Sequence, residues 1–337
     1  ISCMPSTVKI NDLSQILAPI ALDFKALDEV IRQRLASKVA LIDQISTYII
    51  QAGGKRVRPA LLMLTAKSLA NGKETPHILE MSAVVEFIHT ATLLHDDVVD
   101  ESTLRRGRET ANAAFGNAAS VLVGDFLYSR AFQMMVGPND LRVMQILSDA
   151  TNTIAEGEVL QLLNMNDPEV DEASYLQVIR YKTAKLFEAS TELGAILANV
   201  TDAQREQAAA YGRHIGTAFQ LMDDLLDYTA NASQMGKNAG DDLREGKPTL
   251  PLIYLLENGT NEERLLVRAA IEQNQDLPDD VFAQILAAVQ NSGALDYTQA
   301  AAKREADLAL SYLKDFPANP ASQALEALCA YSLTRQT

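Results

Sequence analysis

The sequence predicts an all-α fold built as a single helical bundle. Apolar residues recur at the i, i+3, i+4 spacing of amphipathic helices along the 337 residues. Alternation of Val, Ile and Thr over strand lengths is rare, and prolines fall at the borders of apolar segments rather than inside them. No repeat, linker or low-complexity tract divides the chain, so we expect one domain over residues 1–337.

Turn-forming residues predict where the helices are interrupted. Breaks are expected at residues 71–76, 137–140, 164–172, 231–247 and 258–263. Thr201 and Thr260 each open a capping box, in which the first side chain bonds the backbone of a residue three positions on, so helices are expected to start there. The segment from about Gln275 onward is rich in alanine and has no chemical motif, which predicts a structural role.

Composition and charge exclude several classes of protein. The formal net charge is −15, and no basic stripe with aromatic platforms is present, which argues against a nucleic-acid partner. The longest nearly apolar stretch, residues 113–137, is interrupted by Asp125 and Arg130, so a membrane span there is not expected. The two cysteines, Cys3 and Cys329, give no disulfide framework, which fits a cytoplasmic protein. Residues 1–3, which precede Met4, resemble a cloning remnant.

The same acidic motif occurs twice, as Asp96-Asp97-Val98-Val99-Asp100 and as Asp223-Asp224-Leu225-Leu226-Asp227. Each copy ends an apolar run, and on a helix its first and last aspartates lie one turn apart on one face. One such motif alone is equally well explained as a solvated helix end. Two copies with matching flanks favour Mg²⁺, which keeps several waters and bridges carboxylates to substrate phosphates.

Basic clusters surround these acidic motifs in a chain that is otherwise acidic. They are Gly53-Gly54-Lys55-Arg56-Val57-Arg58-Pro59, Arg105-Arg106-Gly107-Arg108, Tyr181-Lys182-Thr183-Ala184-Lys185, and the segment from Gly236-Lys237 to Lys247-Pro248. Glycine-rich backbone and arginine forks are suited to phosphate oxygens. An anionic substrate needs local positive charge, so the clusters together with the aspartates predict a magnesium–diphosphate site.

These motifs, in this order, resemble the trans-isoprenyl diphosphate synthases, and among them the long-chain bacterial enzymes that make the octaprenyl or nonaprenyl tail of ubiquinone. The matching stretches are residues 53–59, 87–112, 181–190 and 216–251. The resemblance implies an isoprenoid (terpenoid) synthase fold with a central apolar cavity, and a homodimer. It also implies a prenyltransferase that condenses isopentenyl diphosphate onto an allylic diphosphate such as farnesyl diphosphate, with three Mg²⁺ ions per active site.

The resemblance assigns roles to individual residues. The metal cluster comprises Asp96, Asp97, Asp100, Asp223, Asp224 and Asp227, of which Asp97, Asp224 and Asp227 are expected to act through water or as supports. The catalytic set comprises Asp96, Asp100, Lys182, Thr183, Gln220 and Asp223. Isopentenyl diphosphate is expected at Lys55, Arg58, His89 and Arg106, and the allylic diphosphate at Arg105, Lys182, Lys237 and Lys247.

Neutral oxygens of Thr183 and Gln220 are expected to stabilise the carbocation, and released diphosphate is expected to take the final proton. No general base from the protein is therefore required. His89 lies two helical turns before Asp96 and shares its face, whereas His95 has no family role and is interpreted as structural.

Product length is predicted from the residues just before the first aspartate motif. Short-chain members of the family carry bulky aromatic residues four and five positions before the first Asp, where this chain has Thr92 and Ala91. This small pair favours an open tunnel and a long product. Phe132 and Met135, on a helix expected over 118–135, are candidates for a deeper floor, although ordinary core packing explains them equally well.

Three other functions are compatible with parts of this pattern. The first is a shorter-chain prenyl diphosphate synthase. The second is a non-catalytic subunit of a heteromeric prenyl synthase, which would be expected to lack one or both aspartate motifs. The third is a class I terpene cyclase, which usually has Asn, Ser and Glu in its second metal motif and does not need a site for a second diphosphate. Transient membrane contact for release of the apolar product is also expected.

Overall fold

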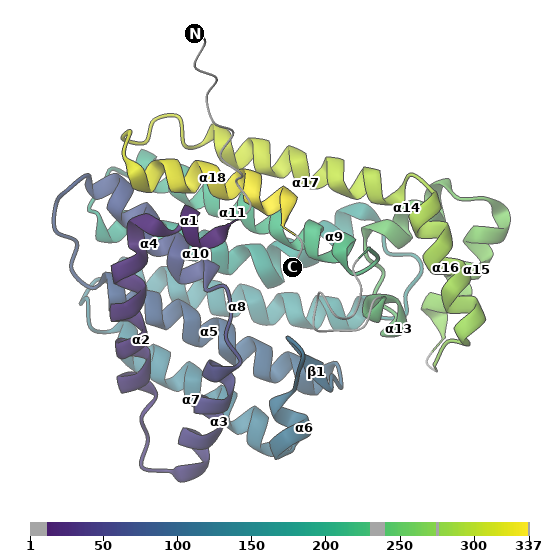
Figure 1. The fold of residues 1–337 in the computed structure, drawn as a ribbon, viewed down its shortest axis with the longest axis horizontal. Coiled ribbons are helices and arrows are strands. Elements are labelled where there is room, and N and C mark those ends of the chain that lie inside the picture. The colour runs from purple at the N-terminus through teal and green to yellow at the C-terminus, as the bar shows by residue number, and fades with distance from the viewer. Residues whose placement is uncertain (1–11, 230–239, 274–275, 336–337) are drawn as a thin grey trace, which may run out of the picture.

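The chain folds into a helical bundle in the computed structural model, which describes residues 12–229, 240–273 and 276–335 (Figure 1). The elements are α1 (Leu13–Ile16), a 3₁₀ turn (Ala18–Ile20), α2 (Ala21–Leu35), α3 (Ala40–Gln51), α4 (Val57–Ala70), α5 (Ile78–Val99), β1 (Leu104–Arg105), β2 (Arg108–Glu109), α6 (Ala111–Phe115), α7 (Asn117–Met135), α8 (Leu141–Asn164), α9 (Glu172–Ile179), the π-helix η2 (Arg180–Ala184), α10 (Lys185–Leu197), α11 (Asp202–Leu226), α13 (Asp241–Arg244), α14 (Leu250–Asn258), α15 (Asn261–Glu272), α16 (Asp279–Asn291), α17 (Ala294–Ser311) and α18 (Pro320–Thr334).

The long helices α5, α8, α10 and α11 run along the molecule, with α2 across one end and α15 and α16 at the other (Figure 1). The centre of the bundle is formed by α4 and α10, most of whose residues are buried. Helix α10 packs against α4 on one side and α11 on the other, and α5 packs most extensively against α7. The C-terminal helices close the bundle, because α17 packs on α11 and α18 packs on α4.

A glycine permits a close approach between two helices of this core. A Cβ atom added to Gly194 on α10 would lie 2.7 Å from the carbonyl oxygen of Leu62 on α4. Real Cβ atoms do not approach a backbone oxygen that closely, so any larger residue would push the two helices apart. The sequence position of Gly194 inside a helix therefore reflects packing rather than a turn.

The expected all-α fold and most expected helix boundaries are confirmed. The capping boxes at Thr201 and Thr260 are both formed and start α11 and α15. Four of the five expected breaks contain no helix beyond single terminal residues and the first turn of α15. The break expected at 231–247 contains the short helix α13. Residues 231–239 of that break lie outside the described residues.

Two local features differ from a plain bundle. The expected loop after the first aspartate motif is a two-stranded antiparallel hairpin, in which Arg105 pairs with Arg108. The expected regular helix around Lys182 contains the π-helix η2, in which one extra residue widens the turn. No helix in the described ranges is long and apolar enough to cross a bilayer.

Candidate functional site

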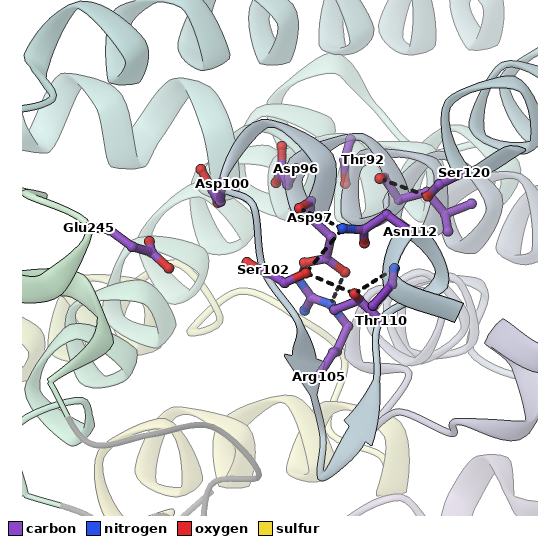
Figure 2. A network of polar contacts seen from close by, with 12 residues as sticks. Thr92, Asp96, Asp97, Asp100, Ser102, Arg105, Thr110, Asn112, Ser120 and Glu245 are labelled. Carbon is purple, nitrogen blue, oxygen red and sulfur yellow. Dashed lines mark hydrogen bonds and ion pairs between the residues drawn. The ribbon is translucent and has the colours of Figure 1, made fainter. Parts of the chain in front are cut away.

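The first aspartate motif ends α5, and its three carboxylates have two different roles. Asp96 and Asp100 line a cavity of about 370 Å³. Asp97 is buried and turned toward the β1–β2 hairpin, where Arg105 donates two hydrogen bonds of 2.8 and 2.6 Å to its two oxygens (Figure 2). Such a bidentate pair fixes the guanidinium plane as well as its position. Asp97 therefore holds the hairpin against the end of α5.

Further hydrogen bonds tie this hairpin to the start of α6. The Asn112 amide donates to the carbonyl oxygens of Asp97 and Ser102 at 3.3 and 3.1 Å, and the Thr110 hydroxyl donates to that of Ser102 at 2.8 Å (Figure 2). The backbone on both sides of the hairpin is thereby fixed. Arg105 and Arg106 are thus presented at the edge of the cavity by a rigid loop rather than a flexible one.

The second aspartate motif ends α11 and repeats this division. Asp223 is 47% exposed at its side chain and faces the cavity. Asp224 is 6% exposed and accepts hydrogen bonds from Tyr175 and from the Gln220 amide, the latter at 2.9 Å. Asp227 accepts from the backbone N–H of Asp242 at 3.2 Å, which ties α13 to α11. Burial and the negative charge of Asp242 raise the pKa of Asp224 to about 7.

Two lysines contact the cavity-lining carboxylates of the first motif. The Lys182 Nζ atom lies 3.4 Å from Asp96 and 3.1 Å from Glu158 on α8. The Lys247 Nζ atom lies 3.3 Å from Asp100 and 2.6 Å from Glu245. These contacts neutralise part of the negative charge at the end of α5. Burial is the largest cause that raises the pKa of Glu158 to about 8, and the charge of Asp96 adds to it, while Lys182 opposes both.

The π-helix explains how Lys182 and Thr183 reach the cavity. A Cβ atom added to Gly157 on α8 would lie 2.7 Å from the backbone nitrogen of Lys182, so the absence of a side chain there allows the widened turn to pack against α8. Lys182 also donates a hydrogen bond to Gln161, one helical turn beyond Gly157. The Thr183 hydroxyl donates to the Gln220 carbonyl oxygen at 3.1 Å, which joins η2 to α11.

A second cavity of about 810 Å³ adjoins the first, and the two share the following lining residues: Asp96, Arg105, Arg106, Lys182, Thr183, Gln220 and Asp223. The residues expected to bind the second diphosphate all line this cavity, namely Lys55, Arg58, His89 and Arg106. A single continuous site is therefore built from the start of α4, the middle of α5, the hairpin, η2 and the end of α11.

Contacts among these cations define the diphosphate pocket. Arg58 stacks over the ring of Phe187 at 4.6 Å, and its Nη1 atom lies 3.3 Å from the His89 Nε2 atom. A Cβ atom added to Gly54 would lie 2.7 Å from the Arg106 guanidinium, so glycine leaves the space that this arginine occupies.

Burial and mutual repulsion lower the pKa values of these groups. Desolvation, followed by the charges of Arg58 and Arg106, holds the pKa of His89 well below its usual value, so the imidazole is neutral at pH 7. Desolvation, followed by the nearby Arg335, lowers the pKa of Lys55 to about 8. Desolvation is also the main cause that lowers the pKa of Arg58 to about 10. An anion in this pocket would relieve the repulsion among these groups.

Comparison with known proteins identifies the family. The family model described as "Polyprenyl synthetase" matches residues 39–289. The chain belongs to this polyprenyl synthetase family. It is 49% identical to the octaprenyl diphosphate synthase of Escherichia coli strain K12, over 97% of this chain and 98% of that protein. It is 47% identical to the all-trans-nonaprenyl-diphosphate synthase of Rhodobacter capsulatus, over 95% of this chain and 97% of that protein.

A solved structure agrees with the sequence relatives. The polyprenyl synthase of Caulobacter crescentus, determined with calcium and isoprenyl diphosphate, is 43% identical and superimposes with a TM-score of 0.93, over 98% of this chain and all of that one. The expected family, the isoprenoid synthase fold and long-chain trans-polyprenyl diphosphate synthesis are confirmed. The protein is a prenyltransferase of a family that uses a divalent metal.

The donor set of this polyprenyl synthetase fits such a metal only together with a substrate. No group of three or more His, Cys, Asp or Glu side chains in the described ranges is close enough to hold an ion by itself. Asp96, Asp100 and Asp223 nevertheless bring hard oxygen donors to one cavity, beside cations suited to phosphate. Mg²⁺ commonly takes one or two carboxylates and completes its shell with water and phosphate oxygens. The residues present therefore fit a metal that arrives with a diphosphate.

The structure brings only some of the predicted chain-length residues to the site. Thr92 lines the larger cavity, but Ala91, Phe132 and Met135 line neither of the two. Ala91 and Met135 are buried in the core, and Phe132 is 42% exposed on α7. The roles of these residues remain predictions. Lys247 lies at the smaller cavity as expected, whereas Lys237 lies outside the described residues.

Several residues of the site were missed from the sequence. They are Glu86, Glu158, Gln161, Tyr175, Glu245 and Arg335, all of which line one of the two cavities. Glu158 and Gln161 carried a usable signal, because two polar residues three positions apart share one helix face. Tyr175 carried none, since a lone tyrosine in an apolar helix is indistinguishable from core. His95, predicted to be structural, lies 3.0 Å from the carbonyl oxygen of Val121 on α7.

The lowered pKa of Lys55 predicts proton uptake when a diphosphate binds. A lysine with a pKa of about 8 is roughly half neutral at pH 8, and a bound anion raises its pKa, so the site should take up roughly half a proton at that pH. Calorimetry of inorganic diphosphate binding in buffers of different ionisation enthalpy measures this number. Uptake should rise from pH 7 to pH 8.5 and shrink in Lys55→Arg, because arginine stays charged. Equal uptake in both proteins would contradict the assignment.

Proposed function

We propose that this polyprenyl synthetase elongates an allylic diphosphate with isopentenyl diphosphate to an all-trans product of eight or nine isoprene units, which supplies a quinone side chain. The single observation that carries the residue assignments is the continuous double cavity, with carboxylates and cations at one part and four cationic or imidazole groups at the other. Two diphosphates need two such subsites. A terpene cyclase needs only the first.

In the proposed mechanism the allylic diphosphate lies at the smaller cavity beside Arg105, Lys182 and Lys247. Magnesium, with three ions per site, would be held by Asp96, Asp100 and Asp223 and would supply Lewis-acid neutralisation of the leaving diphosphate. Cations fixed in advance at the place where negative charge develops are the protein's largest contribution to catalysis. Asp97, Asp224 and Asp227 support this arrangement through the hairpin, Gln220 and α13.

The reaction breaks the allylic C–O bond, and its electron pair leaves with the diphosphate oxygen. The double bond of isopentenyl diphosphate then supplies the electrons of the new C–C bond, and a proton is lost to the released diphosphate. Lys55, Arg58, His89 and Arg106 hold the second substrate by its diphosphate. Thr183 and Gln220, which line both cavities, lie between the two subsites and offer oxygen atoms to the transient cation.

A homodimer is proposed as the working assembly. Large apolar side chains are exposed along the outer faces of α7 and α8, namely Leu122, Phe132, Leu141, Val159, Leu162 and Leu163. A monomer in water gains by covering such a surface. Location in the cytoplasm and brief membrane contact of the apolar product belong to the same proposal.

Product analysis tests the proposed activity. Purified protein given Mg²⁺, farnesyl diphosphate and labelled isopentenyl diphosphate should yield, after dephosphorylation, one dominant alcohol of eight or nine isoprene units. Asp96→Ala should lower turnover at least a hundredfold while its circular dichroism spectrum stays that of the wild type, because it removes a carboxylate from the cavity and not from the core. A dominant product of three or four units would favour a short-chain synthase. Full activity of Asp96→Ala would refute the metal assignment.

Chain length should respond to Thr92 more cleanly than to Ala91. Thr92 lines the larger cavity, so Thr92→Phe should shorten the main product by several isoprene units with little loss of stability. Ala91 is fully buried, so Ala91→Phe should overpack the core and cost about 1–3 kcal/mol of unfolding free energy. Chromatography of products and thermal unfolding measure the two effects, with Thr92→Ser as the matched control. An unchanged product from Thr92→Phe would contradict the open-tunnel prediction.

The dimer proposal is tested by the oligomeric state. Sedimentation equilibrium at micromolar concentration should give twice the mass of one chain, and Leu163→Glu on the exposed face of α8 should shift it toward a single chain. The exposed Leu265→Glu on α15 is the matched control and should leave the dimer intact. A wild-type protein of single-chain mass would contradict the proposal.

A further inference from the structure

A chain of three hydrogen bonds connects a buried tyrosine to the oxygens that face the reacting carbon atoms. Tyr175 on α9 donates to one carboxylate oxygen of Asp224, and the Gln220 amide donates to the other at 2.9 Å. The Thr183 hydroxyl then donates to the Gln220 carbonyl oxygen at 3.1 Å. The chain thus begins in α9, passes through α11 and ends in η2.

The chemistry of the carboxylate fixes the polarity of this chain. Both oxygens of the Asp224 carboxylate accept hydrogen bonds, one from Tyr175 and one from Gln220, so Gln220 turns its NH₂ group to Asp224 and its carbonyl oxygen to Thr183. Thr183 has a single hydroxyl hydrogen, and donating it to Gln220 leaves only lone pairs for the cavity. With the amide reversed, N–H groups rather than oxygen would lie toward Thr183. Both side chains therefore present acceptor oxygens, the polarity that a transient carbocation requires.

Tyr175 is placed to hold Asp224 in the orientation that this polarity needs. Both residues are 6% exposed, and the tyrosine ring packs in an apolar cluster with Ile179, Leu221 and Leu225. Few conformations are available to a ring packed in this way, so its hydroxyl has a fixed direction. Without that donor, one oxygen of a buried carboxylate would lose its partner, and Asp224 would reorient or recruit another one.

We propose that Tyr175 is a positioning residue for prenyl transfer, which acts through Asp224 to keep the oxygens of Gln220 and Thr183 turned toward the allylic carbon. This inference rests on the proposed function, because only an ionising substrate makes the polarity matter. Among the described residues, the Tyr175 hydroxyl donates to Asp224 and to no cationic side chain of either diphosphate subsite. Tyr175 therefore stabilises the transition state and does not change the affinity for substrate.

The test compares steady-state kinetics of single and double variants. Tyr175→Phe keeps the ring in its cluster and should lower kcat about tenfold, with KM for both diphosphates unchanged. The Gln220→Leu substitution removes the part of the hydrogen-bond chain beyond Asp224. In that background Tyr175→Phe should change kcat less than twofold. Tyr297→Phe is the matched control, because Tyr297 also donates to a carboxylate, that of Glu172 on α9, but lines neither cavity. It should leave kcat unchanged.

Other outcomes overturn the inference. They are an unchanged kcat in Tyr175→Phe, an equal loss in both backgrounds, a loss that appears in KM, or a loss that follows a lowered melting temperature. If the wild-type protein transfers no prenyl group to any primer, the proposed function fails separately. The hydrogen-bond chain is then tested by the ¹H–¹⁵N chemical shifts of the Gln220 side-chain amide in metal-free protein. Tyr175→Phe changes these shifts if the chain exists and leaves them unchanged if it does not.

Discussion

Concentration of negative charge at the ends of two helices is the constraint on which the rest of the site depends. Both aspartate motifs end their helices at the C-terminus, where the helix dipole is itself negative. Carboxylates are less stable there than at any other helix position. The surrounding structure compensates at the first motif with Arg105, Lys182 and Lys247, which contact Asp97, Asp96 and Asp100. At the second motif Arg335 contacts Asp223. A metal with a diphosphate would meet the same demand during turnover.

The compensation differs between the carboxylates, and this divides each motif into parts. Asp97 and Asp224 are buried, and both oxygens of each accept hydrogen bonds from the protein. Asp96, Asp100 and Asp223 line the smaller cavity together with these two, but their side chains are less buried. Each Asp-Asp-x-x-Asp sequence thus contains buried carboxylates beside carboxylates that line the cavity. The second aspartate of each motif, and Asp227 as well, bind neighbouring parts of the protein.

Much of the fold could be predicted from the sequence because helix periodicity and capping are local properties. The capping boxes at Thr201 and Thr260 show this, since their partners lie three residues away. The π-helix at Lys182 could not be predicted, because it packs against Gly157 on another helix. Tyr175 was missed because its partner, Asp224, also lies on another helix. The sequence gives the distance of each chain-length residue from the aspartates but not the side of the helix that faces the cavity. Ala91 and Thr92 therefore appeared equivalent, although only Thr92 lines the cavity.

The extra residue in η2 has a geometric consequence for the helix that precedes it. Each residue turns an α-helix by about 100°, so a regular turn in place of Arg180–Ala184 would rotate α9 by that angle relative to α10. The core face of α10 is fixed by α4 and α11, so α9 would have to absorb the rotation. Tyr175 would then point away from α11. Deletion of Arg180 would preserve every motif in the sequence and still disconnect α9 from the second aspartate motif.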